Sequence, residues 1–396
     1  MGESELIPVN EPYIGEKEIE YVLEAVKSTF ISSEGKFIRE FEEKFSSFCG
    51  RRYGVAVNNG TNALVLAIRA LELEEGSEVI LPSFTIISCA LAVIYNGLIP
   101  VFVDSEPETY NIDPEKIEEK ITERTKSILM VHTYGHPCEV DKILEIAEKY
   151  NLYVIEDFAE AIGSEYKGRK CGSFGVISCT SFYANKLITT GEGGMCLTDD
   201  EKLAQKMRRL RNLAFIPEKR FLHYELGFNF RMTNVQAAIG LAQLENASER
   251  IEKKIKIARK YSETLKELED KGILKLPTQK SYAKNTYWMY GIVMKNGVKA
   301  DIIMKKLEER GVQTRPFFYP LHLQPAFKKF SWFREEKLEV AEFLSEFGFY
   351  IPSGLTLNDE KIERICKAFY EVIDEIENKK TIQSKELKIE KNVGKE

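Results

Sequence analysis

Between residues 53 and 198, short apolar stretches alternate with segments that have helical periodicity. The apolar stretches fall at 53–57, 79–82, 101–104, 127–133, 152–156, 177–182 and 194–197. Helical patterns lie between several of them, at 62–71, 88–95 and 140–150. Strands that alternate with helices predict a mostly parallel sheet covered on both faces, with ligands at the carboxyl ends of the strands. The sequence therefore predicts an α/β fold.

The chain length predicts two domains, because 396 residues are too many for one small core. We expect a large domain over residues 1–250 and a smaller α+β domain over 251–377. A long helical pattern at 234–268 is expected to link them. Residues 378–396 contain six lysines, three glutamates and few large apolar residues, which favours disorder or an extension of a helix.

Flanking segments also carry clear patterns. Residues 16–28 place Ile19, Leu23 and Val26 at helical spacing, which predicts an amphipathic helix. Further elements are predicted from periodicity, with helices at 201–212, 299–310, 335–346 and 359–375 and a strand at 288–294.

Polar residues of three kinds fall at or just after predicted strand ends. Gly60-Thr61 joins a strand to a helix, where free backbone N–H groups and the helix dipole would bind an anion. Asp157 directly follows the predicted strand at 152–156. Lys186 lies in a run of small and hydroxyl residues. Because the carboxyl ends of parallel strands meet at one edge, we expect these groups to converge there.

These residue types together favour pyridoxal phosphate chemistry. A lysine that forms a Schiff base must lose its proton near neutral pH, so it needs a desolvated setting. A carboxylate at a strand end would keep a pyridinium nitrogen protonated and make the ring an electron sink. Alone, each group has a simpler interpretation: Lys186 as a surface lysine, Asp157 as a helix N-cap and Gly60-Thr61 as an ordinary turn.

Composition argues against several other classes. A net charge of −6 gives no electrostatic reason to expect nucleic acid, and no apolar run approaches the ~18 residues of a membrane helix. The first residues lack the basic and apolar regions of a signal peptide, and the seven cysteines form no CxxC pair. We therefore expect a cytoplasmic protein. The four histidines have no metal-ligand spacing, so no metal is predicted, and His132 could either face the cleft or pack in the core.

The order of motifs resembles the DegT/DnrJ/EryC1/StrS sugar aminotransferases, which are fold type I pyridoxal phosphate enzymes. The likeness covers roughly residues 6–375. Its motifs are Gly60-Thr61, VIEDFAEAIGS (154–164), SFYANKLITTGEGGM (181–195), NFRMTN (229–234) and TRPFFYPLH (314–322). Within the family, HTYGHPC (132–138), AAIGLAQLE (237–245) and TYWM (286–289) are most similar to the GDP-perosamine synthases.

The resemblance implies a role for each matching position. Lys186 would be the Schiff-base lysine and the acid/base of the proton shift, and Asp157 would pair with the pyridinium nitrogen. Glu160 would lie by the ring hydroxyl, where many relatives have glutamine. The remaining implied contacts are to the cofactor phosphate for Gly60, Thr61 and Ser181, to the phosphate in a neighbouring subunit for Asn229, and to the sugar nucleotide for Arg315, Tyr319 and His322.

One position departs from the family pattern. Relatives usually carry an aromatic residue that stacks on the cofactor ring after the segment 82–85, whereas this chain has Ile86. An aliphatic side chain can still pack on the ring face, so we expect activity to survive.

The resemblance implies a homodimer with shared active sites and transfer of the amino group of L-glutamate to a nucleotide-linked 4-keto-6-deoxyhexose. GDP-4-keto-6-deoxy-mannose, giving GDP-perosamine, is the first choice of substrate. The same reaction on a UDP- or dTDP-linked sugar is the nearest alternative, because no base-reading residue can be identified. A deoxygenating relative would have histidine in place of Lys186, and a non-enzymatic regulatory protein would lack a catalytic residue or carry an added DNA-binding region.

Overall fold

The computed structural model describes residues 6–216 and 218–393 and is built around one seven-stranded sheet. Its strand order is β1-β9-β8-β5-β4-β2-β3. The strands are β1 (Tyr53–Val57), β2 (Glu78–Pro82), β3 (Ile99–Val103), β4 (Thr125–Val131), β5 (Tyr153–Asp157), β8 (Ile177–Ser181) and β9 (Gly194–Thr198). All pairings from β3 through β8 are parallel, which confirms the predicted mostly parallel α/β sheet.

Strand β9 runs against both of its neighbours, β8 and β1. The chain turns back after β8 without a crossover helix, so β9 must pair with β8 in the antiparallel sense. The connection between them is the segment 182–193, which contains Lys186. This reversal holds the predicted lysine loop at the carboxyl end of β8.

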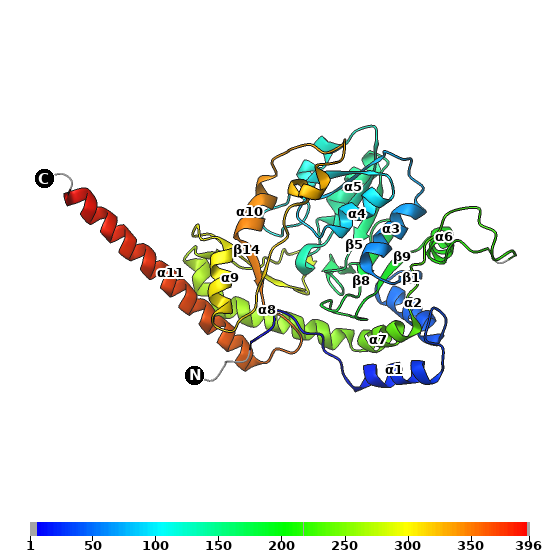
Figure 1. The fold of residues 1–396 in the computed structure, drawn as a ribbon, viewed down its shortest axis with the longest axis horizontal. Helices are drawn as coiled ribbons and strands as arrows, with labels where there is room; N and C mark the ends of the chain where they lie inside the picture. The colour runs from blue at the N-terminus through cyan, green and yellow to red at the C-terminus, as the bar shows by residue number, and fades with distance from the viewer. Residues whose placement is uncertain (1–5, 217, 394–396) are drawn as a thin grey trace.

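Helices cover both faces of the sheet, as alternating side chains require (Figure 1). Val55 and Val57 point to the face covered by α3 (Gly60–Ala70), α4 (Ser88–Tyr95) and α6 (Glu201–Arg211). Ala56, between them, packs on the opposite face. That face is covered by α2 (Lys36–Phe48), α5 (Val140–Lys149) and α7 (Asn234–Glu245).

The predicted linking helix is present but is broken at Asn246. Helix α7 ends at Glu245, and α8 (Ala247–Asp270) continues into the smaller part of the molecule. There it packs with α9 (Ala300–Glu308) and α11 (Asp359–Val393) against a sheet of order β10-β12-β14-β13. The strands of this sheet are β10 (Leu274–Lys275), β12 (Tyr290–Met294), β13 (Arg315–Pro316) and β14 (Gly348–Ile351).

Several elements were not predicted from the sequence. Strand β14 follows α10 (Glu339–Phe347) directly, and a second small sheet of order β11-β6-β7 is made of two-residue strands. Those strands are β6 (Glu165–Tyr166), β7 (Arg169–Lys170) and β11 (Ala283–Lys284). Short 3-10 turns occur at Pro114–Lys116, Glu118–Lys120, Thr133–Gly135, Leu321–Leu323 and Pro325–Phe327. Segments this short have too few residues to show periodicity.

The N-terminal segment 6–10 pairs with the smaller sheet region rather than with the large one. The Ile7 N–H donates to Gly311 O at 2.9 Å, and the Gln313 N–H donates to Ile7 O at 3.0 Å. The Ser353 N–H donates to Val9 O at 3.1 Å. The proposed boundaries at 250 and 377 stay predictions, and α11 carries helical backbone past 378 as far as Val393.

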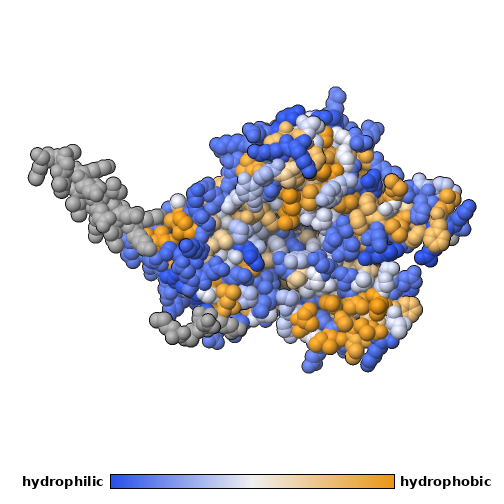
Figure 2. All heavy atoms as spheres, in the orientation of Figure 1, coloured by the Kyte–Doolittle hydropathy of each residue, from blue (hydrophilic) through white to orange (hydrophobic). Residues whose placement is uncertain are grey.

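Helix α1 (Glu16–Lys27) forms where periodicity predicts it, but its apolar face is exposed. It lies along α7 (Figure 1), and Ile19, Leu23 and Val26 are 62%, 50% and 51% exposed. Figure 2 shows a hydrophobic patch at this edge of the molecule. An apolar surface of this kind on a folded chain is typical of an interaction site.

The cysteines of the chain lie in its interior. All seven are free thiols and all are buried, as expected for small hydrophobic residues in a protein without disulfides. No helix in the described part of the chain combines the length and apolar content that a bilayer crossing needs.

Candidate functional site

A cleft of about 320 Å³ opens at the carboxyl ends of β4, β5 and β8, where the topology predicts a ligand site. Its walls come from both parts of the molecule, because Phe318 and Tyr350 lie in the smaller part. The predicted residues that line it are Gly60, Thr61, Ile86, Asp157, Glu160, Ser181 and Lys186. The groups that were expected to converge therefore lie around one cavity.

The first turn of α3 forms one end of this cleft. Asn59 caps the helix by accepting a hydrogen bond from the Asn62 N–H at 2.8 Å. At Gly60 a Cβ atom would lie 2.6 Å from Ser181 Cβ, so only glycine lets the backbone approach the end of β8 this closely. Thr61 Oγ1 donates to Ser88 Oγ at 2.8 Å and also borders the cleft. Helix N–H groups, a dipole and two hydroxyls together make an anion site.

Two neighbouring carboxylates at the end of β5 have opposite surroundings. Glu156 is fully buried and accepts hydrogen bonds from the Gly172 N–H at 2.6 Å, the Phe174 N–H at 2.8 Å and Ser178 Oγ at 2.7 Å. Its fourth partner is His132 Nε2, at 2.9 Å. Successive side chains of a strand point to opposite faces, so Asp157 faces the cleft instead.

Asp157 is held in place but keeps an oxygen directed toward the cleft. Its Oδ1 accepts the Ala159 N–H at 3.0 Å, and its Oδ2 accepts the Cys89 thiol at 3.5 Å. Burial raises the pKa of the Asp157 carboxyl, while the Ala159 N–H and the nearby Lys186 act in the opposite direction. A buried carboxylate whose charge is only partly compensated is suited to a cationic ring nitrogen.

Glu160 and Lys186 face each other across the cleft. The Lys186 side chain is only 10% exposed, and its Nζ lies 4.0 Å from Glu160 Oε1. Burial raises the pKa of Glu160 to about 7, and its other oxygen accepts the Tyr134 N–H at 2.9 Å. Burial also lowers the pKa of Lys186, although Glu160 and Asp157 oppose this shift. The lysine therefore has the desolvated setting that a nucleophilic amine requires.

Trp288 is a site residue to which the sequence assigned no role. Its ring centroid lies 3.6 Å from Lys186 Nζ, and its indole N–H donates to Asn185 O at 2.9 Å. The Asn10 side chain donates to the same carbonyl at 3.2 Å. The only sequence signal was the phrase TYWM (286–289), which carries the family likeness without indicating a contact.

Four predicted residues lie outside the lining of this cleft in the single chain. Asn229 is exposed and pairs with Asn212 beside a segment, described over 213–216 and 218–228, that projects next to α6 (Figure 1). Arg315 and Tyr319 are exposed, whereas His322 is buried and hydrogen-bonded to Ser83 Oγ at 2.7 Å. Their roles toward a partner subunit or a sugar nucleotide stay predictions.

His132 packs in the core rather than at the cleft. It accepts the Cys138 N–H at its Nδ1, 3.0 Å away, so its Nε2 donates to Glu156. One atom from each of His132, Glu156 and Cys171 falls within a 4.8 Å group that could geometrically hold a cation. Both oxygens of Glu156 already accept two hydrogen bonds, so this arrangement is explained by packing.

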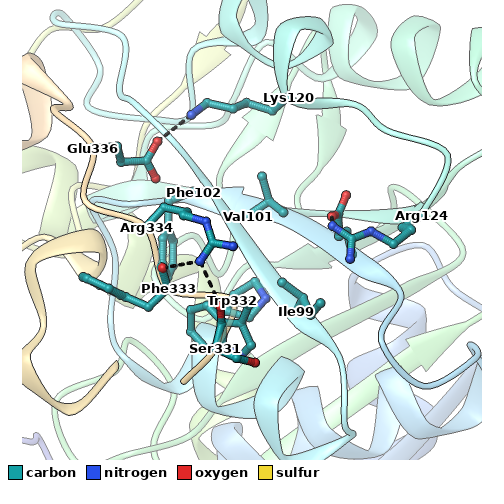
Figure 3. Close-up of a pocket in the computed structure, with 12 residues that line it drawn as sticks. Ile99, Val101, Phe102, Lys120, Arg124, Ser331, Trp332, Phe333, Arg334 and Glu336 are labelled. Carbon is teal, nitrogen blue, oxygen red and sulfur yellow. Dashed lines mark hydrogen bonds and ion pairs between the residues drawn. The ribbon is translucent and has the colours of Figure 1, made fainter. Parts of the chain in front are cut away.

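A second hollow of about 440 Å³ lies between the edge strand β3 and the segment 331–336 (Figure 3). It shares no lining residue with the cleft at Lys186. Two of its cations are already paired, Arg124 with Glu78 and Lys120 with Glu336, and the third, Arg334, donates to the backbone carbonyls of Ser331 and Phe333. Asp157, Glu160 and Lys186, whose pKa values are shifted, lie together at the first cleft. We therefore take that cleft as the functional site.

Comparisons with known proteins identify the family to which the chain is similar. A profile of the DegT/DnrJ/EryC1/StrS aminotransferase family matches residues 12–370. The GDP-perosamine synthase of Caulobacter vibrioides is 41% identical over 375 residues, which cover 94% of this chain and 100% of that protein. The X-ray structure of an aminotransferase from Psychrobacter cryohalolentis matches with a TM-score of 0.88 and 32% identity, covering 93% and 99% of the two chains. Helicobacter pylori PseC, an aminotransferase involved in pseudoaminic acid biosynthesis, matches with a TM-score of 0.89 and 28% identity. The match covers 94% of this chain and 100% of that chain.

The contrast between the two carboxylates predicts opposite effects of matched amide substitutions on stability. Glu156→Gln replaces two acceptor positions by an amide N–H₂ that faces donors, so it should lower the free energy of unfolding by about 3 kcal/mol. Asp157→Asn should leave it unchanged or raise it at neutral pH, because a carboxyl whose folded pKa is raised destabilises the fold when ionised. This gain should vanish below the ordinary Asp pKa of 3.8. Urea unfolding of both variants at several pH values measures the free energy of unfolding. An equal loss in the two variants would contradict the different surroundings assigned to Glu156 and Asp157.

Proposed function

The chain belongs to the DegT/DnrJ/EryC1/StrS aminotransferase family, and from this premise we propose that it moves the amino group of L-glutamate to the C4 ketone of a nucleotide-linked 4-keto-6-deoxyhexose. Its cofactor is pyridoxal 5'-phosphate. The observation that carries the proposal is the desolvated Lys186 amine, 4.0 Å from the Glu160 carboxyl in a cleft that also contains Asp157 and the N-terminus of α3.

The chemistry of the side chains that line the cleft matches the groups of the cofactor. The α3 N-terminus with Thr61 and Ser181 would hold its phosphate, and Asp157 would face its ring nitrogen. Two buried polar atoms in residues that line the cleft, Thr180 Oγ1 and Asn185 Oδ1, have no hydrogen-bond partner in the protein. Unpaired groups of this kind are costly unless a ligand or water satisfies them.

The bound cofactor supplies an electron sink that stabilises negative charge at the carbon next to the transferred nitrogen. Asp157 would keep the ring nitrogen protonated, because an ionised carboxylate beside this nitrogen favours its positively charged form. Lys186 Nζ, when uncharged, removes the α-proton of the amino donor and returns a proton during the second half of the reaction. The ring of Trp288 and the side chain of Ile86 line the cleft beside this proton path.

The proposed substrate follows from the relatives rather than from a nucleotide-reading residue. The GDP-perosamine synthase of Caulobacter vibrioides covers nearly the whole chain at 41% identity, which supports GDP-4-keto-6-deoxy-mannose as the acceptor and GDP-perosamine as the product. The same chemistry on a UDP- or dTDP-linked sugar is the second candidate. The presence of Lys186 in the cleft argues against both a deoxygenating enzyme and a non-enzymatic regulator.

We also propose a homodimer with shared active sites. Asn229 is exposed and does not line the cleft of its own chain, so a role toward cofactor phosphate requires a second copy. The neighbouring segment carries Phe221, Tyr224 and Leu226, which are 82%, 80% and 91% exposed. Together with the exposed face of α1, these side chains form apolar surface typical of a subunit interface (Figure 2).

Substrate choice is tested with the purified protein converted to its pyridoxamine form. GDP-, UDP- and dTDP-linked 4-keto-6-deoxy sugars are offered separately while the return of the pyridoxal form is followed by absorbance. We expect rapid return with the GDP sugar alone. Return only with another nucleotide would keep the reaction and discard this substrate, and no return with any of them would exclude the proposed function.

Glu160 predicts a pH effect on capture of the cofactor. The carboxyl is largely protonated below its pKa of about 7 and ionised above it, where its negative charge raises the pKa of Lys186. In Glu160→Gln this attraction is lost, so more of the lysine is uncharged at a given pH. The rate at which apoprotein takes up pyridoxal 5'-phosphate should then rise at lower pH than in the parent. Glu165→Gln, at a carboxylate paired with Lys284 outside the cleft, is the matched control, and coincident profiles would contradict the assignment.

Shared sites predict complementation between two inactive variants. Lys186→Met lacks the catalytic amine, and Asn229→Ala lacks the group proposed to reach the partner's site, so each alone should lose at least about a hundredfold in rate. When the two are unfolded together and refolded, a mixed dimer contains one site with both residues intact. Up to about a quarter of parental activity should return, because half of the dimers are mixed and each has one complete site. Sites made of one chain only would give no recovery.

A further inference from the structure

Trp288 lies just before β12 and is held by several contacts. Its indole N–H donates to Asn185 O, and its ring packs against Tyr134 with centroids 6.2 Å apart. The preceding residue, Tyr287, has a φ of 52°, a left-handed conformation that non-glycine residues rarely adopt. This local reversal turns the indole toward Lys186, and such strained residues persist only where surrounding contacts hold them.

A further contact to Trp288 comes from a buried lysine, Lys254, on α8. Lys254 is 4% exposed, and its Nζ donates to Trp288 O at 2.7 Å and to Ser353 O at 2.6 Å. Ser353 Oγ lies 3.3 Å from the same nitrogen. No carboxylate in the described part of the chain pairs with Lys254, and burial lowers its pKa to about 7.

The surroundings of Lys254 suit an amine in either protonation state. An uncharged amine has two hydrogens, which match the two backbone carbonyls at the shortest distances. A protonated amine has a third hydrogen, which Ser353 Oγ accepts at 3.3 Å. A buried lysine without a counterion is unfavourable for folding, so its presence needs another explanation than stability.

We propose that Lys254 is a positioning residue of the active site: it fixes the carbonyl of Trp288 and thereby holds the indole face against the Lys186 amine. The inference rests on the proposed role of Lys186. A cation over an indole face is stabilised by the ring quadrupole. When Lys186 is released from the cofactor, its ammonium form therefore has a defined place, between Trp288 on one side and Glu160 on the other.

This arrangement also connects proton transfer with the junction of the two parts of the molecule. Lys254 lies on α8, Trp288 just before β12, and Ser353 just after β14. A shift of the smaller sheet relative to α8 would move the Trp288 carbonyl, and with it the ring that faces Lys186. The acid/base group is thus supported by a residue that touches neither substrate nor cofactor.

The protein contains two tryptophans, so a single substitution gives a direct reporter. Trp332 lines the hollow of Figure 3, away from the cleft. In Trp332→Phe the indole fluorescence of the full-length apoprotein comes from Trp288 alone. We expect it to titrate with the Lys186 ammonium, at a pH below the ordinary lysine value, and this step should be absent when Lys186→Met is added. Glu160, Asp157 and Cys89, the other groups that influence the Lys186 pKa, stay unchanged throughout.

Lys254→Met in this background tests the proposal, with Lys253→Met on the exposed side of the same helix as the matched control. We expect Lys254→Met to shift the Lys186 step and the emission maximum, whereas Lys253→Met should leave both as in the parent. In the holoenzyme, kcat should fall by about tenfold to a hundredfold with little change in the KM for the sugar. Lys254→Gln, which keeps donor hydrogens on a shorter side chain, should restore part of the loss.

The outcomes separate this inference from the proposed function. An unchanged Trp288 titration and an unchanged pH profile of pyridoxal phosphate uptake in folded Lys254→Met would overturn the positioning role. If Lys254→Met does not fold, the same two measurements on Lys254→Gln decide the question in the same way. Failure of all three nucleotide sugars in the half-reaction would overturn the proposed function and leave the indole titration as it is.

Discussion

The geometry of the site depends on the four hydrogen bonds that the buried Glu156 accepts. Two come from backbone N–H groups of the segment after β5, one from Ser178 on the neighbouring strand and one from His132. A carboxylate in this position is stable only when its lone pairs are fully used, so the end of β5 is fixed in position and register. Asp157 then points into the cleft because it is the next residue of the strand.

The ionisable groups of the cleft modify one another's chemistry. Burial favours the neutral forms of Asp157, Glu160 and Lys186, while the attraction of the lysine to either carboxylate favours the charged forms. The balance gives Glu160 a pKa of about 7, so its charge changes near neutral pH. This chain therefore has a group that can exchange a proton close to the Lys186 amine.

Much of the fold could be predicted because its signals are local. The strand at 53–57 and the helix at 88–95 have the predicted bounds, and Gly60, Asp157 and Lys186 meet at one cleft because parallel strands share an edge. The break at Asn246 and the two-residue strands depend on contacts between distant segments, which periodicity does not contain. Trp288 and Lys254 were missed for the same reason: a tryptophan before a strand and one lysine among many on a charged helix look ordinary until packing brings them together.

The pairing of the first described residues with the smaller sheet has a consequence for the order in which the chain acquires its structure. Val9 bonds to Gln313, which lies 304 residues further along, and to the backbone of Ser353. During synthesis from the N-terminus, the earliest segment must wait unpaired until most of the polypeptide has left the ribosome. Asn10, which contacts the lysine loop through Asn185, waits with it. The lysine loop therefore gains its contact to Asn10 only after the smaller part of the molecule has been synthesised.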